Sequence, residues 1–211
     1  MARSTRSNPL ALAVLACLYE RPMHPYEVAQ TLRSRAKHES VRLNYGSLYG
    51  VVELLEKRGF VSARETVREG RRPERTIYEI TDSGARELND WLSDLVATPV
   101  KEYLQFEAAL SFLPVLPPDG AAEVLQERAT ALEFKLTQMR AMRAATDAAG
   151  LPRLFELEGD YVEALTVAEL DFVRALVKDI ESGELDGLEM WRAWYEADGD
   201  MTWHPPEGPP A

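Results

Sequence analysis

The sequence has little of what disulfides and metal sites are made of. It contains one cysteine, Cys17, and three histidines at scattered positions. A single cysteine excludes a disulfide within the chain, and no group of His, Cys, Asp or Glu has the spacing of a metal cluster. His24 precedes an expected helix and is interpreted as its cap. No polar residues have the spacing of a catalytic triad, so we expect no catalytic residues, no metal and no cofactor.

Long apolar runs are also absent. No run approaches the roughly 18 residues that a membrane span requires. The short basic start at residues 1–7 lacks the apolar stretch of a signal peptide. We therefore expect a cytoplasmic protein with no membrane partner, and a single cysteine fits a reducing compartment.

Positive charge is scarce overall, but unevenly so. The 211 residues carry 24 Lys and Arg against 35 Asp and Glu, a formal net charge of −11. Residues 1–97 are nearly balanced with a small basic excess, whereas residues 98–211 are strongly acidic. Phosphate neutralisation needs clustered basic residues, so only the first half is compatible with a nucleic-acid partner. The acidic half would have to face away from the duplex.

The first half has the order of elements of a winged helix. Apolar residues at helical spacing predict helices over about 9–20, 25–37 and 44–58. Two short β-branched and aromatic segments at 60–65 and 76–80 flank a turn with a basic tip. Thr81 then caps a fourth helix that continues to about 96. The predicted fold is mainly α, with a small β-hairpin wing.

The second half is helical throughout in its pattern. Thr98-Pro99 marks a boundary, and helices are expected over about 100–113, from 119 onward, over 152–182 and over 188–195. Apolar residues in both long helices recur at steps of four and three, as in a coiled coil, which predicts an antiparallel arm. The seam expected in the second long helix comprises Leu157, Tyr161, Leu165, Ala168, Phe172 and Leu176.

These patterns predict three regions. Residues 1–97 form a winged helix-turn-helix DNA-binding domain, residues 98–200 an all-α antiparallel dimerisation and effector domain, and residues 201–211 a disordered tail rich in proline. The residues assigned to the dimer contact are Leu125, Leu132, Leu136, Met139, Leu165, Phe172 and Leu176.

The third helix has little bulk opposite its apolar face, where Gly46 and Gly50 lie. Such a face suits a helix that enters the major groove, and arginines at a hairpin tip suit a minor groove or a phosphate. Alternatively, the glycines only loosen a surface helix, the tyrosines pack against neighbours, and the arginines are a solvated charge run. The expected DNA contacts are Asn44, Tyr45, Gly46, Ser47, Tyr49 and Lys57 from the helix, and Arg68, Arg71, Arg72 and Arg75 from the hairpin.

Three motifs in this order resemble the PadR-like family of regulators. His-Pro-Tyr-Glu at 24–27 is similar to the family's His-Gly-Tyr-Glu, and Gly-Ser-Leu-Tyr at 46–49 is similar to its recognition-helix motif. The stretches 70–73 and 77–81 resemble its wing. Proline at 25 and glycine at 50 depart from the family, which usually has glycine and often proline there. The resemblance covers 9–97 closely, and the later helices resemble the C-terminal domain of longer members more loosely.

The resemblance implies a homodimer formed largely by the C-terminal helices, repression of a nearby gene and release by a small, often aromatic or drug-like, molecule. Trp91, Tyr103 and Phe106 are the expected lining of an effector pocket, although aromatic residues on amphipathic helices more often pack in a core. The roles of Trp191, Trp194 and Trp203 are left open between a dimer contact and a partner surface.

The predicted function is therefore sequence-specific binding of operator DNA by a dimeric transcriptional repressor, with each subunit reading one half of a palindromic site. Two alternatives remain. One is a dimeric ligand-binding or protein-adaptor module whose winged helix no longer binds DNA. The other is an enzyme, which would need a polar catalytic set that the sequence does not show.

Overall fold

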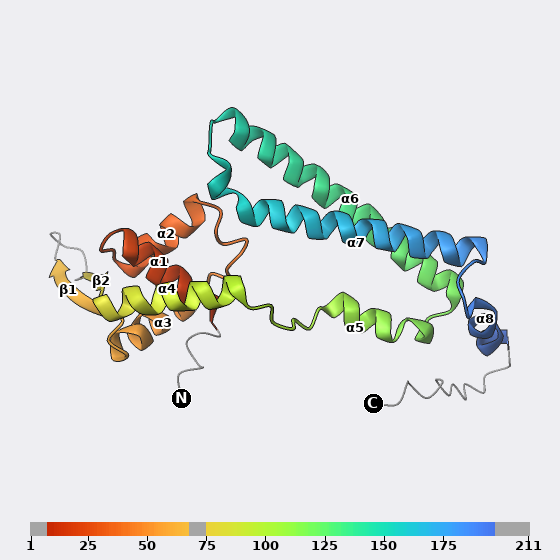
Figure 1. The fold of residues 1–211 in the computed structure, drawn as a ribbon, viewed down its shortest axis with the longest axis horizontal. Helices are drawn as coiled ribbons and strands as arrows, with labels where there is room; N and C mark the ends of the chain where they lie inside the picture. Colours follow the sequence, from red (N-terminus) through yellow and green to blue (C-terminus); the bar gives the residue numbers. More distant parts are fainter. Residues whose placement is uncertain (1–7, 68–74, 197–211) are drawn as a thin grey trace. The chain divides into compact units, whose positions relative to one another are not determined.

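The computed structural model describes residues 8–67 and 75–196. The chain divides into two compact units, and the boundary in the sequence falls between Lys101 and Glu102 (Figure 1). Unit 1 contains α1 (Pro9–Glu20), α2 (Pro25–Ser34), α3 (Tyr45–Lys57), β1 (Val61–Val67), β2 (Arg75–Ile80) and α4 (Asp82–Ala97). Unit 2 contains α5 (Gln105–Ser111), η2 (Leu113–Val115), α6 (Pro118–Ala148), η3 (Arg153–Phe155), α7 (Leu157–Ser182) and α8 (Leu188–Glu196).

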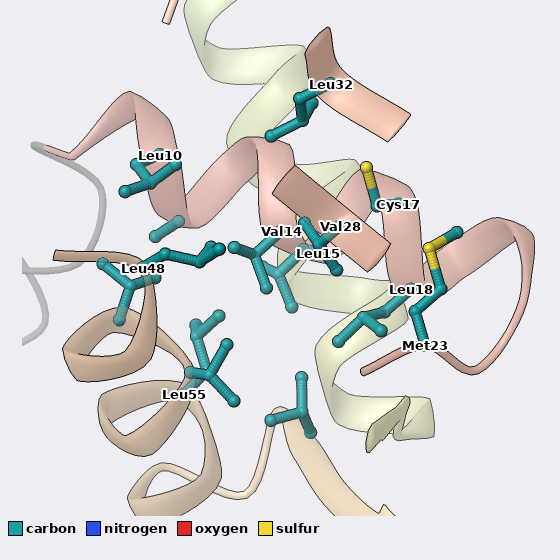
Figure 2. Packing of buried hydrophobic residues seen from close by; sticks show 14 of the residues in the cluster. Leu10, Val14, Leu15, Cys17, Leu18, Met23, Val28, Leu32, Leu48 and Leu55 are labelled. Atoms are coloured by element: carbon teal, nitrogen blue, oxygen red, sulfur yellow. The ribbon is translucent and has the colours of Figure 1, made fainter. Parts of the chain in front are cut away.

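Helix α1 is the centre of unit 1. It begins at Pro9 because the Asn8 side chain accepts a hydrogen bond from the Leu10 amide at 3.1 Å. It packs against α2, α3, α4 and β2, and its buried residues are Leu10, Ala11, Val14, Leu15, Cys17 and Leu18. Figure 2 shows Leu48 and Leu55 of α3 on the side of that helix that faces α1. The orientation of α3 is therefore fixed by apolar contacts on one face, which leaves its other face to solvent.

The wing is an antiparallel pair of strands with a third, short contact. β1 pairs with β2 from Val61 opposite Ile80, with a bulge between Ala63 and Glu65. Met23, between α1 and α2, exchanges two backbone hydrogen bonds of 3.0 Å with Tyr78 of β2. This bridge ties the helix-turn-helix to the base of the wing. The mainly α fold with a β-hairpin wing, as predicted, is confirmed.

Side chains at the start of α4 form hydrogen bonds with the turn between α3 and β1. The Thr81 hydroxyl caps α4 by accepting from the Gly84 amide at 3.1 Å and donates to the Gly59 carbonyl at 2.6 Å. The Ser83 hydroxyl lies 2.8 Å from the same carbonyl oxygen. The end of α3 and the base of the wing are thus held to one helix terminus.

Unit 2 is built on an antiparallel hairpin of α6 and α7, which lie side by side in Figure 1. Ion pairs join Arg128 to Glu169 and Arg140 to Glu163, so later residues of α6 meet earlier residues of α7. The predicted arm is therefore present. Helix α8 packs on this hairpin through buried Leu188 and Trp191.

The prediction that the seam residues of α7 form the contact within the arm was wrong. The side chains of α7 that are buried are Thr166, Leu170, Val173, Val177 and Ile180. Leu157, Tyr161, Leu165 and Phe172, which the sequence pattern assigned to the seam, are exposed. Both the buried set and the predicted set recur at steps of four and three residues, so α7 carries two apolar stripes and α6 covers only one.

Helix boundaries differ from prediction mostly in unit 2. α5 is shorter than the expected 100–113 and α7 begins later than 152. In the part of the chain that the structure describes, no helix is long and apolar enough to cross a membrane. Within the same residues, no cluster of His, Cys, Asp and Glu is arranged to hold a metal ion. The tail at 201–211 and Trp203 lie outside the described residues.

Candidate nucleic-acid interface

The motif at residues 24–27 forms the start of α2. Nδ1 of His24 accepts a hydrogen bond from the Tyr26 amide at 3.1 Å, as predicted for a helix cap. A carboxylate oxygen of Glu27 accepts in return from the His24 amide at 2.9 Å. This capping box satisfies amides at the helix terminus and fixes where α2 begins. His24 and Glu27 thus serve the fold, whereas Tyr26 is exposed.

Helix α3 presents to solvent a polar face that contains two glycines. The Asn44 side-chain oxygen accepts from the Gly46 amide at 2.9 Å and so caps the helix. Leu48, Val51, Val52 and Leu55 are buried on the opposite side. The exposed residues include Asn44, Gly46, Ser47, Tyr49, Gly50, Glu53 and Lys57.

Neither glycine of α3 is required by packing within the described chain. A Cβ on Gly50 would meet no atom within 4 Å, and a Cβ on Gly46 would meet only the Asn44 side-chain oxygen at 3.6 Å. Each glycine costs a helix up to about 1 kcal/mol relative to alanine. The described structure contains nothing that offsets this cost, so a partner that approaches the backbone closely would account for both residues.

The tyrosines of α3 make contacts that the sequence left as an alternative. Tyr45 is half-buried, and its hydroxyl accepts a 2.6 Å hydrogen bond from the Arg33 guanidinium of α2. The Tyr45 ring stacks on Tyr26, with centroids 6.2 Å apart and an interplanar angle of 15°. Tyr49 meets the His24 ring edge-on, with centroids 6.2 Å apart. The tyrosines pack against neighbours, yet Tyr26 and Tyr49 also remain exposed.

The exposed part of α3 has no excess of positive charge. Glu53, Glu56 and Lys57 are all exposed. Burial, followed by the nearby charges of Glu56 and Glu53, raises the pKa of Tyr78. The cations that a polyanion requires must therefore come from elements around α3.

The wing is described only at its base. Arg64 lies 3.8 Å from a carboxylate oxygen of Glu79 across the strand pair. Arg75 begins β2, opposite Val67. Three of the arginines predicted to contact DNA, Arg68, Arg71 and Arg72, lie outside the described residues.

The expected effector residues occupy three different environments. Trp91 is 2% exposed in the core of unit 1, and among the described residues its indole Nε1 has no hydrogen-bond partner. Tyr103 is 86% exposed. Phe106 of α5 packs at the edge of the core of unit 2, with the Arg128 guanidinium carbon 3.7 Å from its ring centroid. Their common role in an effector pocket stays a prediction.

The expected dimer residues divide between core and surface. Leu125, Leu132 and Leu136 are buried within the hairpin, and Met139 and Leu176 are half-buried. Leu165 and Phe172 are 52% and 50% exposed. Of the seven, these two of α7 are the most accessible to a second copy.

Two of the three C-terminal tryptophans help to hold unit 2 together. Trp191 donates its indole N–H to the Leu116 carbonyl at 2.9 Å, and Trp194 packs against the same core. The Tyr195 hydroxyl lies 2.6 Å from the Val115 carbonyl oxygen. Helix α8 therefore anchors the turn that precedes α6.

Residues 14–90, which contain α2, α3, both strands and most of α1 and α4, match the model of the transcriptional regulator PadR-like family. Over these residues the chain is similar to the PadR-like family of transcriptional regulators. The resemblance noted from the three sequence motifs is thereby confirmed.

Two kinds of relative extend this PadR-like match. The negative transcriptional regulator PadR of Bacillus subtilis is 25% identical over 139 residues, which span 62% of this chain and 71% of that protein. The crystal structure of B. subtilis PadR in complex with operator DNA has a TM-score of 0.68 at 19% identity, covering 82% of this chain and 99% of that one. The crystal structure of B. subtilis PadR in complex with p-coumaric acid has a TM-score of 0.64 at 18% identity, covering 82% and 95%. At these identities the structures show a shared fold.

Arg33 and Tyr26 were missed as members of this surface by the sequence reasoning. Arg33 precedes Tyr45 by 12 positions and lies on another helix, so no periodicity within one helix connects the two. Tyr26 lies in a motif that the family shares, and this was the one signal available from the sequence.

Proposed function

We propose that this PadR-like protein is a DNA-binding transcriptional repressor that acts as a homodimer and is released by a small-molecule effector. The observation that supports DNA binding most directly is the exposed face of α3, where two glycines bring the backbone to the surface without any packing reason. A recognition helix in the major groove requires such close approach. A relative with the same fold binds operator DNA.

The exposed stripe of α7 supports the homodimer. Tyr161, Leu165 and Phe172 lie at spacings of four and seven, so their side chains share one side of the helix, and all are at least half exposed. An apolar stripe of this kind is typical of a surface that another helix covers. Two copies would place two α3 helices for two half-sites of a palindromic operator.

The proposed effector is a small aromatic molecule. A relative with the same fold binds p-coumaric acid, an aromatic carboxylic acid. An effector that binds one arrangement of the subunits better than another would shift the protein between them, with a coupling of about 1 to 3 kcal/mol.

A titration against two DNA duplexes tests DNA binding. One duplex comes from the region upstream of the protein's own gene and the other has a random sequence of equal length. We expect tighter binding of the upstream duplex and a loss of this preference in Gly50→Leu, because leucine at 50 fills the space that the groove edge would occupy. The fold should tolerate leucine, since a Cβ at 50 meets nothing within 4 Å.

Gly159→Leu in α7 is the matched control, because a Cβ on Gly159 also meets nothing within 4 Å and the residue lies in a helix of unit 2. Its preference for the upstream duplex should equal that of the wild type. Equal binding of both duplexes by the wild-type protein would favour the adaptor function. Unchanged preference in Gly50→Leu would contradict the placement of α3 in the groove.

A further inference from the structure

Arg33 lies in the last turn of α2 and is exposed. Its guanidinium donates a 2.6 Å hydrogen bond to the Tyr45 hydroxyl, and its central carbon lies 4.7 Å from the Tyr45 ring centroid. Because Tyr45 also stacks on Tyr26, the cation is attached to a pair of aromatic rings that bridges the two helices of the helix-turn-helix.

The neighbouring Arg35 provides a contrast. Its two terminal nitrogens donate to the two carboxylate oxygens of Glu20 at 2.5 and 2.7 Å, so its charge is neutralised within the fold. No ion pair joins Arg33 to a carboxylate among residues 8–67 and 75–196. A guanidinium has five N–H donors, and the contact with neutral Tyr45 uses one of them while leaving the charge in place.

The position of Arg33 is where a DNA backbone would pass. In a helix-turn-helix, the first helix crosses the phosphate backbone while the start of the second enters the groove. Arg33 is bound to Tyr45, the first residue of α3. The exposed part of α3 carries two carboxylates, Glu53 and Glu56, and one cation, Lys57. The cations that neutralise phosphates must therefore come from elements beside that helix.

We propose that Arg33 contacts a backbone phosphate and that Tyr45 is its positioning residue, not a reader of bases. This inference rests on the proposed DNA-binding function. Arginine suits phosphate because its planar donors bind two oxygens at once. The hydrogen bond and ring contact with Tyr45 restrict the rotamers of Arg33 before binding, which lowers the entropy lost when the phosphate contact forms.

The test compares Arg33→Gln with Arg35→Gln, two identical charge changes at one end of α2. The probe is a 30-base-pair duplex of random sequence, because phosphate contacts do not depend on sequence. Affinity is measured against salt concentration. We expect Arg33→Gln to reduce the slope of log affinity against log salt by about 0.9 and to weaken binding about five- to tenfold at low salt. Arg35→Gln should leave the slope unchanged.

A double-mutant cycle tests the role of Tyr45. Tyr45→Phe keeps the ring and removes the hydroxyl that accepts from Arg33, and we expect it to weaken binding about two- to threefold. In the Arg33→Gln background it should have no further effect. Tyr49→Phe, which does not contact Arg33 in the described structure, should have the same effect in both backgrounds.

An unchanged salt slope in Arg33→Gln, with wild-type protein that binds DNA, would overturn the assignment of Arg33 alone. An equal effect of Tyr45→Phe in both backgrounds would overturn its positioning role. Wild-type protein that binds neither this duplex nor the upstream duplex would contradict the proposed function and this inference together.

Discussion

At the scale of single residues, two helical glycines of unit 1 have opposite surroundings. A Cβ on Gly84 would lie 2.0 Å from the Phe60 carbonyl oxygen, whereas a Cβ on Gly50 would meet nothing within 4 Å. Gly84 allows the start of α4 to approach the turn between α3 and β1, where Thr81 binds the Gly59 carbonyl. Packing within unit 1 therefore requires a glycine at 84, whereas no contact within the described chain requires one at 50.

We predict that Gly84→Ala lowers the free energy of unfolding by about 2 to 4 kcal/mol, because backbone must move to admit the methyl group. Gly50→Ala should leave that free energy unchanged or raise it by up to about 1 kcal/mol, since alanine favours the helix. Urea denaturation of both variants measures the difference. Equal stability of Gly84→Ala and the wild type would contradict the close contact.

Cys17 predicts how stability changes at alkaline pH. Burial, with a smaller contribution from Glu20, raises the pKa of its thiol from 9.0 to about 11. Between these values the unfolded chain loses the thiol proton and the folded chain keeps it. The unfolded state therefore binds fewer protons, so stability falls as pH rises from 9 to 11, by about 2 kcal/mol.

Urea denaturation at pH 8 and pH 11 measures this loss, with Cys17→Ala as the control. The variant should lose less stability over the interval and retain only the part due to other groups, such as Tyr78, whose pKa is also raised. Identical pH profiles for the two proteins would show that the thiol is not the group responsible.

At the scale of elements, α7 has two apolar stripes, of which one is buried and the other exposed. Val173 is fully buried within the α6–α7 hairpin, while Leu165 and Phe172 are exposed. Removing buried methyl groups affects folding, whereas changing the exposed stripe affects only what covers it. The two stripes can therefore be tested separately.

We expect Val173→Ala to lower the free energy of unfolding by about 2 kcal/mol while the dimer persists. The double change Leu165→Ser, Phe172→Ser should instead yield a monomer with an unchanged helical circular dichroism spectrum. Light scattering after size-exclusion chromatography measures the mass. A double variant with the mass of a dimer would place the dimer contact elsewhere.

Capping explains which helix boundaries could be predicted from the sequence. α1, α3 and α4 begin where predicted because Asn8, Asn44 and Thr81 accept hydrogen bonds from the first-turn amides. The residues at the N-cap positions of α5 and α7, Leu104 and Glu156, make no side-chain cap hydrogen bond, so the sequence carried no local signal for the starts of these helices. The pairing of α6 with one stripe of α7 could not be predicted either, because the residues of both stripes recur at helical steps of three and four.

At the scale of the whole molecule, the sequence predicted the exposed face of α3 because the apolar residues on its other side follow the helical period. It did not predict the contact of Arg33 with Tyr45, which joins separate helices and depends on their packing. The uneven charge of the chain fits this division of roles. The net negative charge lies after residue 97, beyond the family-matched winged helix, because residues 98–211 carry −13 and residues 1–97 carry +2.

The most direct test of the central claim is a selection of bound duplexes from a library of random sequences with purified protein, followed by sequencing. The account predicts an enriched motif with twofold symmetry, whose half-sites lie about 10 base pairs apart or a multiple of that distance. Gly50→Leu should not enrich this motif. Recovery of duplexes with no common sequence by the wild-type protein would contradict sequence-specific recognition by α3.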